Sequence, residues 1–251
     1  MFDLHGHTAL VTGSNRGIGK AIVLALAEQG ANVYIHCRKP VETAQATLRE
    51  AQAYGVQAAC VYGELSEVTA AGDIANQMQQ NALGMPDILV LNASYQIRRP
   101  WDKISAEDFQ CQMQIDFFSS LQLIQCCAPV MLEKRWGRII TIGSTQQAKP
   151  HPEMIVYAGA KLAQQSMVEN LSLQFAPYGV TVNNVAPGTI YTDRNTEALS
   201  DAAYHEKVRR DIPTGYIGQP QDCVAPVVML CSEEGRYISG TNLYVDGAKH
   251  I

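Results

Sequence analysis

The sequence predicts a single-domain α/β fold, in which a doubly wound sheet of seven parallel strands carries helices on both faces. Two observations predict it. Short apolar runs alternate with helix-like segments along the chain, and a glycine-rich turn joins the first run to the first helix. The 251 residues contain no linker-like composition, charge run or internal repeat. We therefore expect residues 1–251 to form one domain.

Each element follows from an apolar run or a helical pattern and the residue that ends it. The first strand, 8–11, leads through the glycine-rich turn into a helix over 18–29. Gly30 ends this helix and Gly55 ends the next one, because glycine is common just beyond a helix C-terminus. The other expected strands are 32–36, 57–61, 87–91, 138–142, 181–185 and 242–245. The other expected helices are 41–54, 68–83, 106–134 with a break near Pro129, one that carries Tyr157 and ends at about Tyr178, 196–210 and 223–230. This order gives a sheet of Rossmann type.

Composition and charge exclude several classes of protein. The net charge of −5 and scattered Lys and Arg residues argue against a nucleic-acid-binding surface. No apolar stretch approaches the roughly 18 residues of a membrane span, and the first residues lack the basic and apolar regions of a signal peptide. The seven cysteines form no Cys-x-x-Cys pair and have no histidine partners at zinc-site spacing. We expect a reduced, cytoplasmic protein without a metal site.

Tyr157 and Lys161 are the strongest candidates for catalysis. Residues four apart lie on the same face of a helix, where the lysine ammonium can stabilise a phenolate and lower the tyrosine pKa from about 10. Ser144 follows the apolar run 137–142, and strand ends are where open α/β sheets place their chemistry. The alternative is an exposed helix pair with no catalytic role. The glycine-rich turn and Asn92-Ala93-Ser94, at the end of the fourth strand, favour catalysis.

These motifs resemble those of the short-chain dehydrogenase/reductase family, in order and spacing, over nearly the whole chain. The resemblance implies that Tyr157 exchanges a proton with the substrate oxygen while a hydride moves to or from a nicotinamide. Lys161 would lower the tyrosine pKa and bond the nicotinamide ribose, and Ser144 would orient the substrate carbonyl. It also implies a homo-oligomer, a dimer or a tetramer. The motifs that carry it are 12–19, Ser144, Tyr157, Lys161, 187–192 and 245–247.

The cofactor is expected in the glycine-rich turn. Gly13, Gly17 and Gly19 allow the backbone to approach a pyrophosphate at the positive end of the following helix. Cys37 stands where an acid would bind the ribose 2′-hydroxyl of NAD, whereas Arg16 and Arg38 suit a 2′-phosphate. These residues favour NADP(H) over NAD(H), although each arginine alone could be a solvated surface charge. The expected cofactor-binding residues are Gly13, Ser14, Asn15, Arg16, Gly17, Ile18, Gly19, Arg38, Glu64, Leu65, Asn92, Ala93, Ser94, Tyr157, Lys161, Pro187, Gly188, Ile190 and Thr192.

Three positions depart from the family pattern. Glu64 replaces an aspartate near the adenine, and Ser94 replaces a glycine near the ribose. Asp116 replaces an asparagine that helps a water chain reach the lysine, so Asp116 joins the catalytic candidates. Its carboxylate could replace the amide as a polar anchor, which we favour, or its charge could raise the Lys161 pKa and weaken its effect on Tyr157.

The substrate is expected to be a small molecule, a sugar or sugar acid. The loop 93–101 resembles that of gluconate 5-dehydrogenase and 2-deoxygluconate 3-dehydrogenase members. With Ser144, the side chains of Arg98, Gln146 and His151 could bind a carboxylate and hydroxyls. Arg98 and Arg99 could instead lie in solvent or in a subunit contact. Alternative functions are a 3-oxoacyl-carrier-protein reductase, which the net charge does not favour, and a non-enzymatic NADP-binding sensor or scaffold.

Overall fold

The protein is described by a computed structural model that covers residues 2–251; for residues 194, 197 and 198 only the backbone is described. Within this range the strands form one seven-stranded sheet in the order β3-β2-β1-β4-β5-β6-β7, and every neighbouring pair is parallel. The predicted doubly wound Rossmann-type fold is therefore confirmed. The strands are β1 Thr8–Val11, β2 Asn32–Cys37, β3 Ala58–Tyr62, β4 Ile88–Leu91, β5 Gly137–Ile142, β6 Val180–Pro187 and β7 Asn242–Val245.

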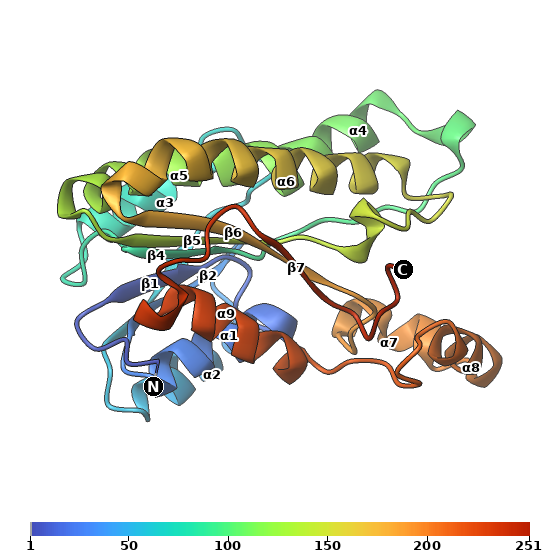
Figure 1. Ribbon diagram of the computed structural model, residues 1–251, viewed down its shortest axis with the longest axis horizontal. Helices are drawn as coiled ribbons and strands as arrows, with labels where there is room; N and C mark the ends of the chain where they lie inside the picture. Colours follow the sequence, from blue (N-terminus) through green and yellow to red (C-terminus); the bar gives the residue numbers. More distant parts are fainter. Residues whose placement is uncertain (1) are drawn as a thin grey trace.

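Helices cover both faces of the sheet (Figure 1). One face carries α1 Gly17–Glu28, α2 Glu42–Gln52 and α9 Val224–Cys231, and the other carries α3 Ala70–Gln79, α4 Ala106–Met113, α5 Ser119–Lys134 and α6 Ile155–Phe175. The helices α7 Asp193–Leu199 and α8 Ala202–Arg210 lie beyond the edge where β6 and β7 end. Short helical turns complete the chain: η1 Trp101–Lys103, η2 Gln114–Phe118, η3 Thr145–Gln147, η4 Ala176–Tyr178, η5 Pro220–Cys223 and η6 Glu233–Gly235.

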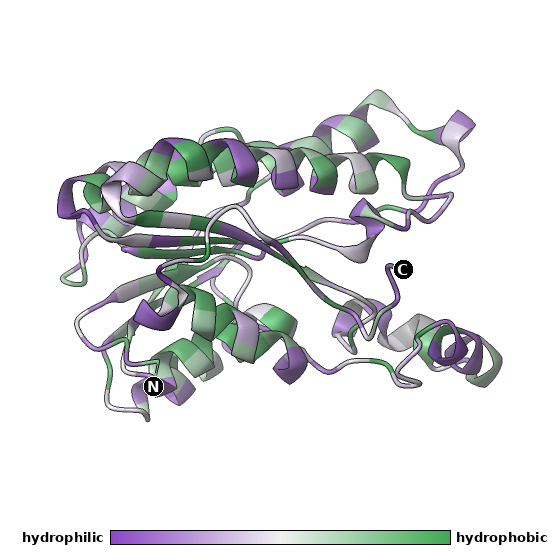
Figure 2. Ribbon diagram, viewed as in Figure 1, coloured by the Kyte–Doolittle hydropathy of each residue, from purple (hydrophilic) through white to green (hydrophobic). Residues whose placement is uncertain are grey.

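The core consists of two apolar layers, one on each side of the sheet. Successive strand residues point to opposite faces, so Val11 packs in the layer under α1 and α9 while Leu10 packs under α3 and α5. Ile140 and Ile139 divide between the two layers in the same way. Figure 2 shows hydrophobic residues in the strands and in the helices on both faces. Because both faces are covered, the strands are mostly apolar, with buried polar exceptions such as Arg138 and Asn184.

Two predicted helix boundaries are wrong. Pro129 lies inside α5 and does not break it; Cys127, Ala128 and Met131 around it are buried against the sheet and hold the helix in place. The irregularity comes earlier, in η2, which is a π-helical turn. The helix expected over 196–210 is two helices, because the Asp201 side chain accepts a hydrogen bond from Tyr204 N (2.7 Å) and starts α8 anew.

The helical stretch Ala106–Lys134 contains a longer apolar segment than the sequence analysis expected anywhere in the chain. Among the described residues it is the one helix long and apolar enough, by length and composition only, to cross a membrane. Its residues Leu123, Ile124 and Cys127 are buried in the core layer beneath α5. A core helix of an α/β fold meets the same criterion, since one of its faces is apolar.

Candidate active site

Most of the predicted site residues lie in loops at the carboxyl edge of the sheet, whereas Tyr157 and Lys161 lie on α6. Strand order reverses between β1 and β4, and this switch point is where open α/β sheets form a ligand crevice. The glycine-rich turn follows β1 and Asn92 follows β4, while Ser144 follows β5 and Gly188 follows β6. The C-terminus lies beside the same edge (Figure 1). The fold therefore gathers segments that are far apart in the sequence.

The glycines of the glycine-rich turn have left-handed backbone, close neighbours or both. Gly13 (φ +62°) and Gly17 (φ +57°) have left-handed backbone, which favours glycine. A Cβ at Gly13 would lie 3.2 Å from the Ala93 Cα, and one at Gly19 would lie 2.5 Å from the Gly13 carbonyl oxygen. The turn then enters α1 at its positive end. This cradle fits the pyrophosphate of a nicotinamide cofactor, and Ser14, Asn15, Arg16 and Ile18 belong to the same turn.

Thr12 and Asn92 hold this turn to the end of β4. The Thr12 hydroxyl accepts hydrogen bonds from Asn92 N and Ala93 N, both at 2.9 Å. The Asn92 side-chain amide donates to Thr12 O at 2.8 Å and so stabilises the turn. Ser94, two residues further along the chain, is half-buried. Thr12 was not among the site residues predicted from the sequence. Its hydroxyl at the end of a buried strand is the signal that could have indicated this supporting role.

His36 is a second support that the sequence did not reveal. Gly13 N donates to His36 Nδ1 (3.1 Å), which leaves Nε2 to carry the proton and donate to Gly63 O (3.1 Å). The ring is fully buried, and this burial lowers the His36 pKa to about 4. A neutral imidazole therefore joins the glycine-rich turn to the end of β3.

The end of β2 presents exposed cations and a buried thiol. Arg38 Nη1 lies 3.5 Å from Glu64 Oε2, and Arg16 Nη1 lies 3.4 Å from Asp193 Oδ2; both guanidinium groups are mostly exposed. The Cys37 thiol is buried and donates to Lys39 O (3.1 Å), and burial raises its pKa. Leu65 next to Glu64 packs in the core. The region where the adenosine end of a cofactor was expected thus has two exposed arginines and no acid at position 37.

Tyr157 and Lys161 lie one turn apart on α6, and both are buried, with 6% and 1% of their surface exposed. Lys161 Nζ donates to Ile142 O (2.8 Å) and to Gln164 Oε1 (3.2 Å). The ammonium lies 5.8 Å from the Tyr157 ring centroid. A fixed positive charge therefore lies next to the phenol.

Asp116 is brought to this pair by the π-helical turn η2. Its Oδ1 lies 3.9 Å from Lys161 Nζ and accepts a hydrogen bond from Tyr95 N at 3.0 Å, and the residue is fully buried. Single π-turns inside helices are frequent at functional sites. Asp116 can thus act both as an anchor for the loop after Asn92 and as a charge beside the lysine.

Ser144, Gln146 and His151 form one chain of contacts. The Ser144 hydroxyl accepts from Gln146 N (3.2 Å), and Gln146 Oε1 accepts from His151 N (2.6 Å). Beneath them, Ser144 N donates to Gln147 Oε1 (2.8 Å), which also accepts from Asn184 Nδ2 (3.2 Å). Gln147 and Asn184 are buried positioning groups that the sequence reading missed.

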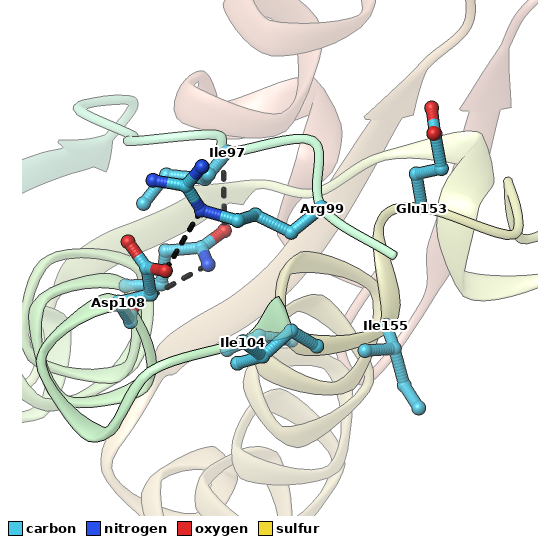
Figure 3. A pocket seen from close by; sticks show the side chains of 8 residues that line it. Ile97, Arg99, Ile104, Asp108, Glu153 and Ile155 are labelled. Atoms are coloured by element: carbon cyan, nitrogen blue, oxygen red, sulfur yellow. Dashed lines mark hydrogen bonds and ion pairs between the residues drawn. The ribbon is translucent and has the colours of Figure 1, made fainter. Parts of the chain in front are cut away.

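The two loop arginines differ in their surroundings. Arg99 Nε donates to Asp108 Oδ2 at 2.9 Å, and Figure 3 shows its side chain turned toward Asp108 while Glu153 points away. Arg99 N also donates to Glu153 O at 2.9 Å, so this residue holds the loop to α4 and to the segment before α6. Arg98 is exposed, and the structure does not bring it into contact with Ser144, Gln146 or His151.

The segment after β6 closes the site from the other side. Gly188 N donates to Val245 O (2.9 Å), and a Cβ at Gly188 would collide with Asp246, so Pro187 and Gly188 run tightly against β7. Ile190 pairs with Gly218 in an isolated bridge. A Cβ at Gly17 would lie 3.5 Å from Thr192 Cγ2, which places this segment against the glycine-rich turn. Apart from the undescribed side chains, residues 2–251 contain no cluster of three His, Cys, Asp or Glu that could hold a metal ion.

The same arrangement occurs in known proteins. A family model described as enoyl-(acyl carrier protein) reductase matches residues 13–250. A 3β-hydroxysteroid dehydrogenase 1 of Eggerthella lenta is 32% identical over 249 residues, 98% of this chain and 94% of that protein. The structure of a 3-oxoacyl (acyl-carrier-protein) reductase from Agrobacterium tumefaciens with NADP bound has a TM-score of 0.93 at 35% identity, covering 98% of this chain and 95% of the other. That of a gluconate 5-dehydrogenase from Burkholderia cenocepacia with NADP and tartrate has a TM-score of 0.92 at 30% identity, covering 99% and 96%.

Proposed function

Because the chain belongs to the short-chain dehydrogenase/reductase family, whose members act on alcohol groups with a nicotinamide cofactor, we propose that its substrate is a sugar acid of the gluconate type. The chain of polar groups from Ser144 through Gln146 to His151 carries this proposal. Hydroxylated substrates need several convergent donors and acceptors, which the side chains of Ser144, Gln146 and His151 can offer. The likeness to a gluconate 5-dehydrogenase with bound tartrate supports it.

The proposed chemistry assigns one role to each catalytic residue. Bound NADP(H) supplies or accepts the hydride. In the reducing direction the Tyr157 hydroxyl gives its proton to the substrate oxygen, and in the oxidising direction the phenolate takes that proton back. The Lys161 ammonium stabilises the phenolate, and the Ser144 hydroxyl donates to the oxygen on which negative charge grows. Asp116 fixes the lysine and the loop at Tyr95, in the role of a polar anchor.

We propose that NADP(H) is preferred over NAD(H). Arg38 has its guanidinium near the solvent and only a weak surface ion pair with Glu64 to exchange for a phosphate. Arginine matches phosphate oxygens with two parallel hydrogen bonds. Two of the similar proteins contain NADP in their structures, which supports the preference.

The first experiment compares the parent protein with Tyr157→Phe. Turnover would be followed at the nicotinamide absorbance with D-gluconate, ketogluconates, neutral sugars and an acetoacetyl thioester, each with both cofactors. We expect reaction with acidic sugars, and a loss of at least about 100-fold in kcat for Tyr157→Phe with NADPH affinity retained. Variant activity within about tenfold of the parent would remove Tyr157 as the acid.

A 3-oxoacyl-carrier-protein reductase is the second candidate, because a protein of that description is 35% identical to this chain. It would reduce the acetoacetyl thioester faster than any sugar acid. The net charge of −5 does not favour docking of an acidic carrier. The same substrate panel therefore separates the two functions, and binding of NADPH without turnover of any carbonyl would favour a non-enzymatic sensor or scaffold.

We also propose that a second copy of the chain covers the outer surface of α6. Leu162 and Leu173 on α6 and Phe109 on α4 are large apolar side chains with 48%, 80% and 50% of their surface exposed. Large apolar side chains that are left exposed on neighbouring helices are typical of association surfaces. Light scattering of the parent and of Leu173→Glu tests this, with a dimer or tetramer expected only for the parent. The cytoplasmic location stays a prediction.

A further inference from the structure

The C-terminal tail, residues 246–251, folds back against the two loops that frame the catalytic residues. Asp246 holds it: its Oδ1 accepts from Ala248 N (3.0 Å), and its Oδ2 accepts from His250 N (2.7 Å). The His250 ring stacks on Tyr244 at 3.9 Å between centroids. Gly247, with φ +64°, fits so tightly against Thr214 that a Cβ would collide with it. The tail is therefore a fixed part of the structure.

This fold of the tail places Lys249 beside the segment after β6. Its Nζ donates to Thr189 Oγ1 at 2.9 Å, and Thr189 directly follows Gly188. From the other loop, Lys149, five residues beyond Ser144, donates to Ile251 O at 3.2 Å. Since β5, β6 and β7 are neighbours in the sheet, the tail joins the loop after β5 to the loop after β6 at the edge that carries the site (Figure 1).

The Lys249 ammonium is half-buried and incompletely compensated. Among the described residues its one hydrogen bond is to an uncharged hydroxyl, and it forms no ion pair with a carboxylate. Burial lowers the Lys249 pKa, and the positive charge of Lys149 lowers it further. The negative charges of Asp211 and Asp246 raise it, although neither forms an ion pair with Lys249. A partly desolvated cation of this kind gains from an anion that brings its own charge.

We propose that the Lys249 ammonium binds the carboxylate of an acidic sugar at the substrate end of the site, so that the C-terminal tail determines the preference for acidic over neutral sugars. This inference rests on the proposed function and deepens it. Thr189 fixes the direction of the lysine, and Lys149 holds the tail in place. The exposed Arg98, which the sequence suggested for the same task, then has no necessary part in binding the carboxylate.

The test compares Lys249→Met, Lys249→Arg and the parent with D-gluconate and D-glucitol, two polyols that differ in a carboxylate. We expect Lys249→Met to raise the KM for gluconate by about tenfold or more, with kcat changed less than about threefold. The KM for glucitol, the NADPH dissociation constant and the thermal midpoint should stay unchanged. Lys249→Arg should restore most of the affinity. Lys207→Met, which removes an exposed charge from α8, is the matched control and should behave as the parent.

Two results would overturn the inference while leaving the proposed function intact. One is turnover of gluconate by the parent with equal losses on both polyols in Lys249→Met. The other is a selective loss on gluconate in Arg98→Ala and none in Lys249→Met. Weaker NADPH binding by Lys249→Met would assign the lysine to the cofactor and also refute it. If the parent turns over no acidic sugar with either cofactor, the proposed function and this inference fail together.

Discussion

Replacing His36 should remove a specific part of the acid sensitivity of this protein. His36 titrates near pH 6.5 in an unfolded chain, whereas burial lowers its pKa to about 4 in the folded protein. The unfolded state therefore binds a proton first as the pH falls. The stability that this residue contributes is complete above about pH 6.5 and is lost progressively as the pH falls from 6.5 to 4.

The size of this effect follows from the same two pKa values. A difference between 6.5 and about 4 corresponds to about 3 kcal/mol when the loss is complete, and to about 2 kcal/mol between pH 7.5 and pH 5. In the folded protein Nδ1 is protonated only near pH 4, where the acceptor for Gly13 N, and with it the support of the glycine-rich turn, is lost. NADPH binding by the folded protein should therefore weaken only as the pH approaches 4.

Urea unfolding of the parent and of His36→Asn at pH 7.5 and pH 5 measures this contribution. Asparagine keeps an oxygen that can accept from Gly13 N but does not titrate. We expect the variant to be less stable at pH 7.5, and the parent to lose about 2 kcal/mol more than the variant on going to pH 5. His5→Asn, at an exposed position, controls for the loss of a histidine as such. Parallel pH dependence of the parent and His36→Asn would refute the reasoning.

The remaining predictions concern the cofactor and the lysine. Arg38→Leu should raise the KM for NADPH by about tenfold or more and leave that for NADH nearly unchanged, since a charged phosphate contact is lost; Arg49→Leu, whose arginine pairs with Glu42, is the control. A parent that already prefers NADH would contradict the assignment. Asp116→Asn keeps an acceptor for Tyr95 N and should retain kcat within about tenfold, whereas Asp116→Leu, which leaves that N–H unsatisfied, should lose about 100-fold or more. Equal losses in both variants would show that the charge of Asp116, and not its hydrogen bond, is required.

The sequence by itself determined the sheet, the glycine-rich turn and the Tyr157–Lys161 pair. These features rest on local patterns: apolar runs, glycines that end helices, and a spacing of four residues on one helix face. It misjudged Pro129, because burial of the neighbouring side chains against the sheet outweighs the local preference of proline. It also joined α7 and α8, since the Asp201 cap that separates them is a single side-chain contact.

Only the tertiary structure decided which groups surround those motifs. The sequence separation between Asp116 and Lys161, between Gly13 and His36, and between Thr189 and Lys249 is too large for any local pattern to predict a contact. Each contact exists because parallel strands bring their carboxyl ends to one edge, where loops from distant parts of the chain meet. The reacting residues can thus be recognised from local sequence motifs, whereas the charges and hydrogen bonds that position them depend on the order of the strands in the sheet.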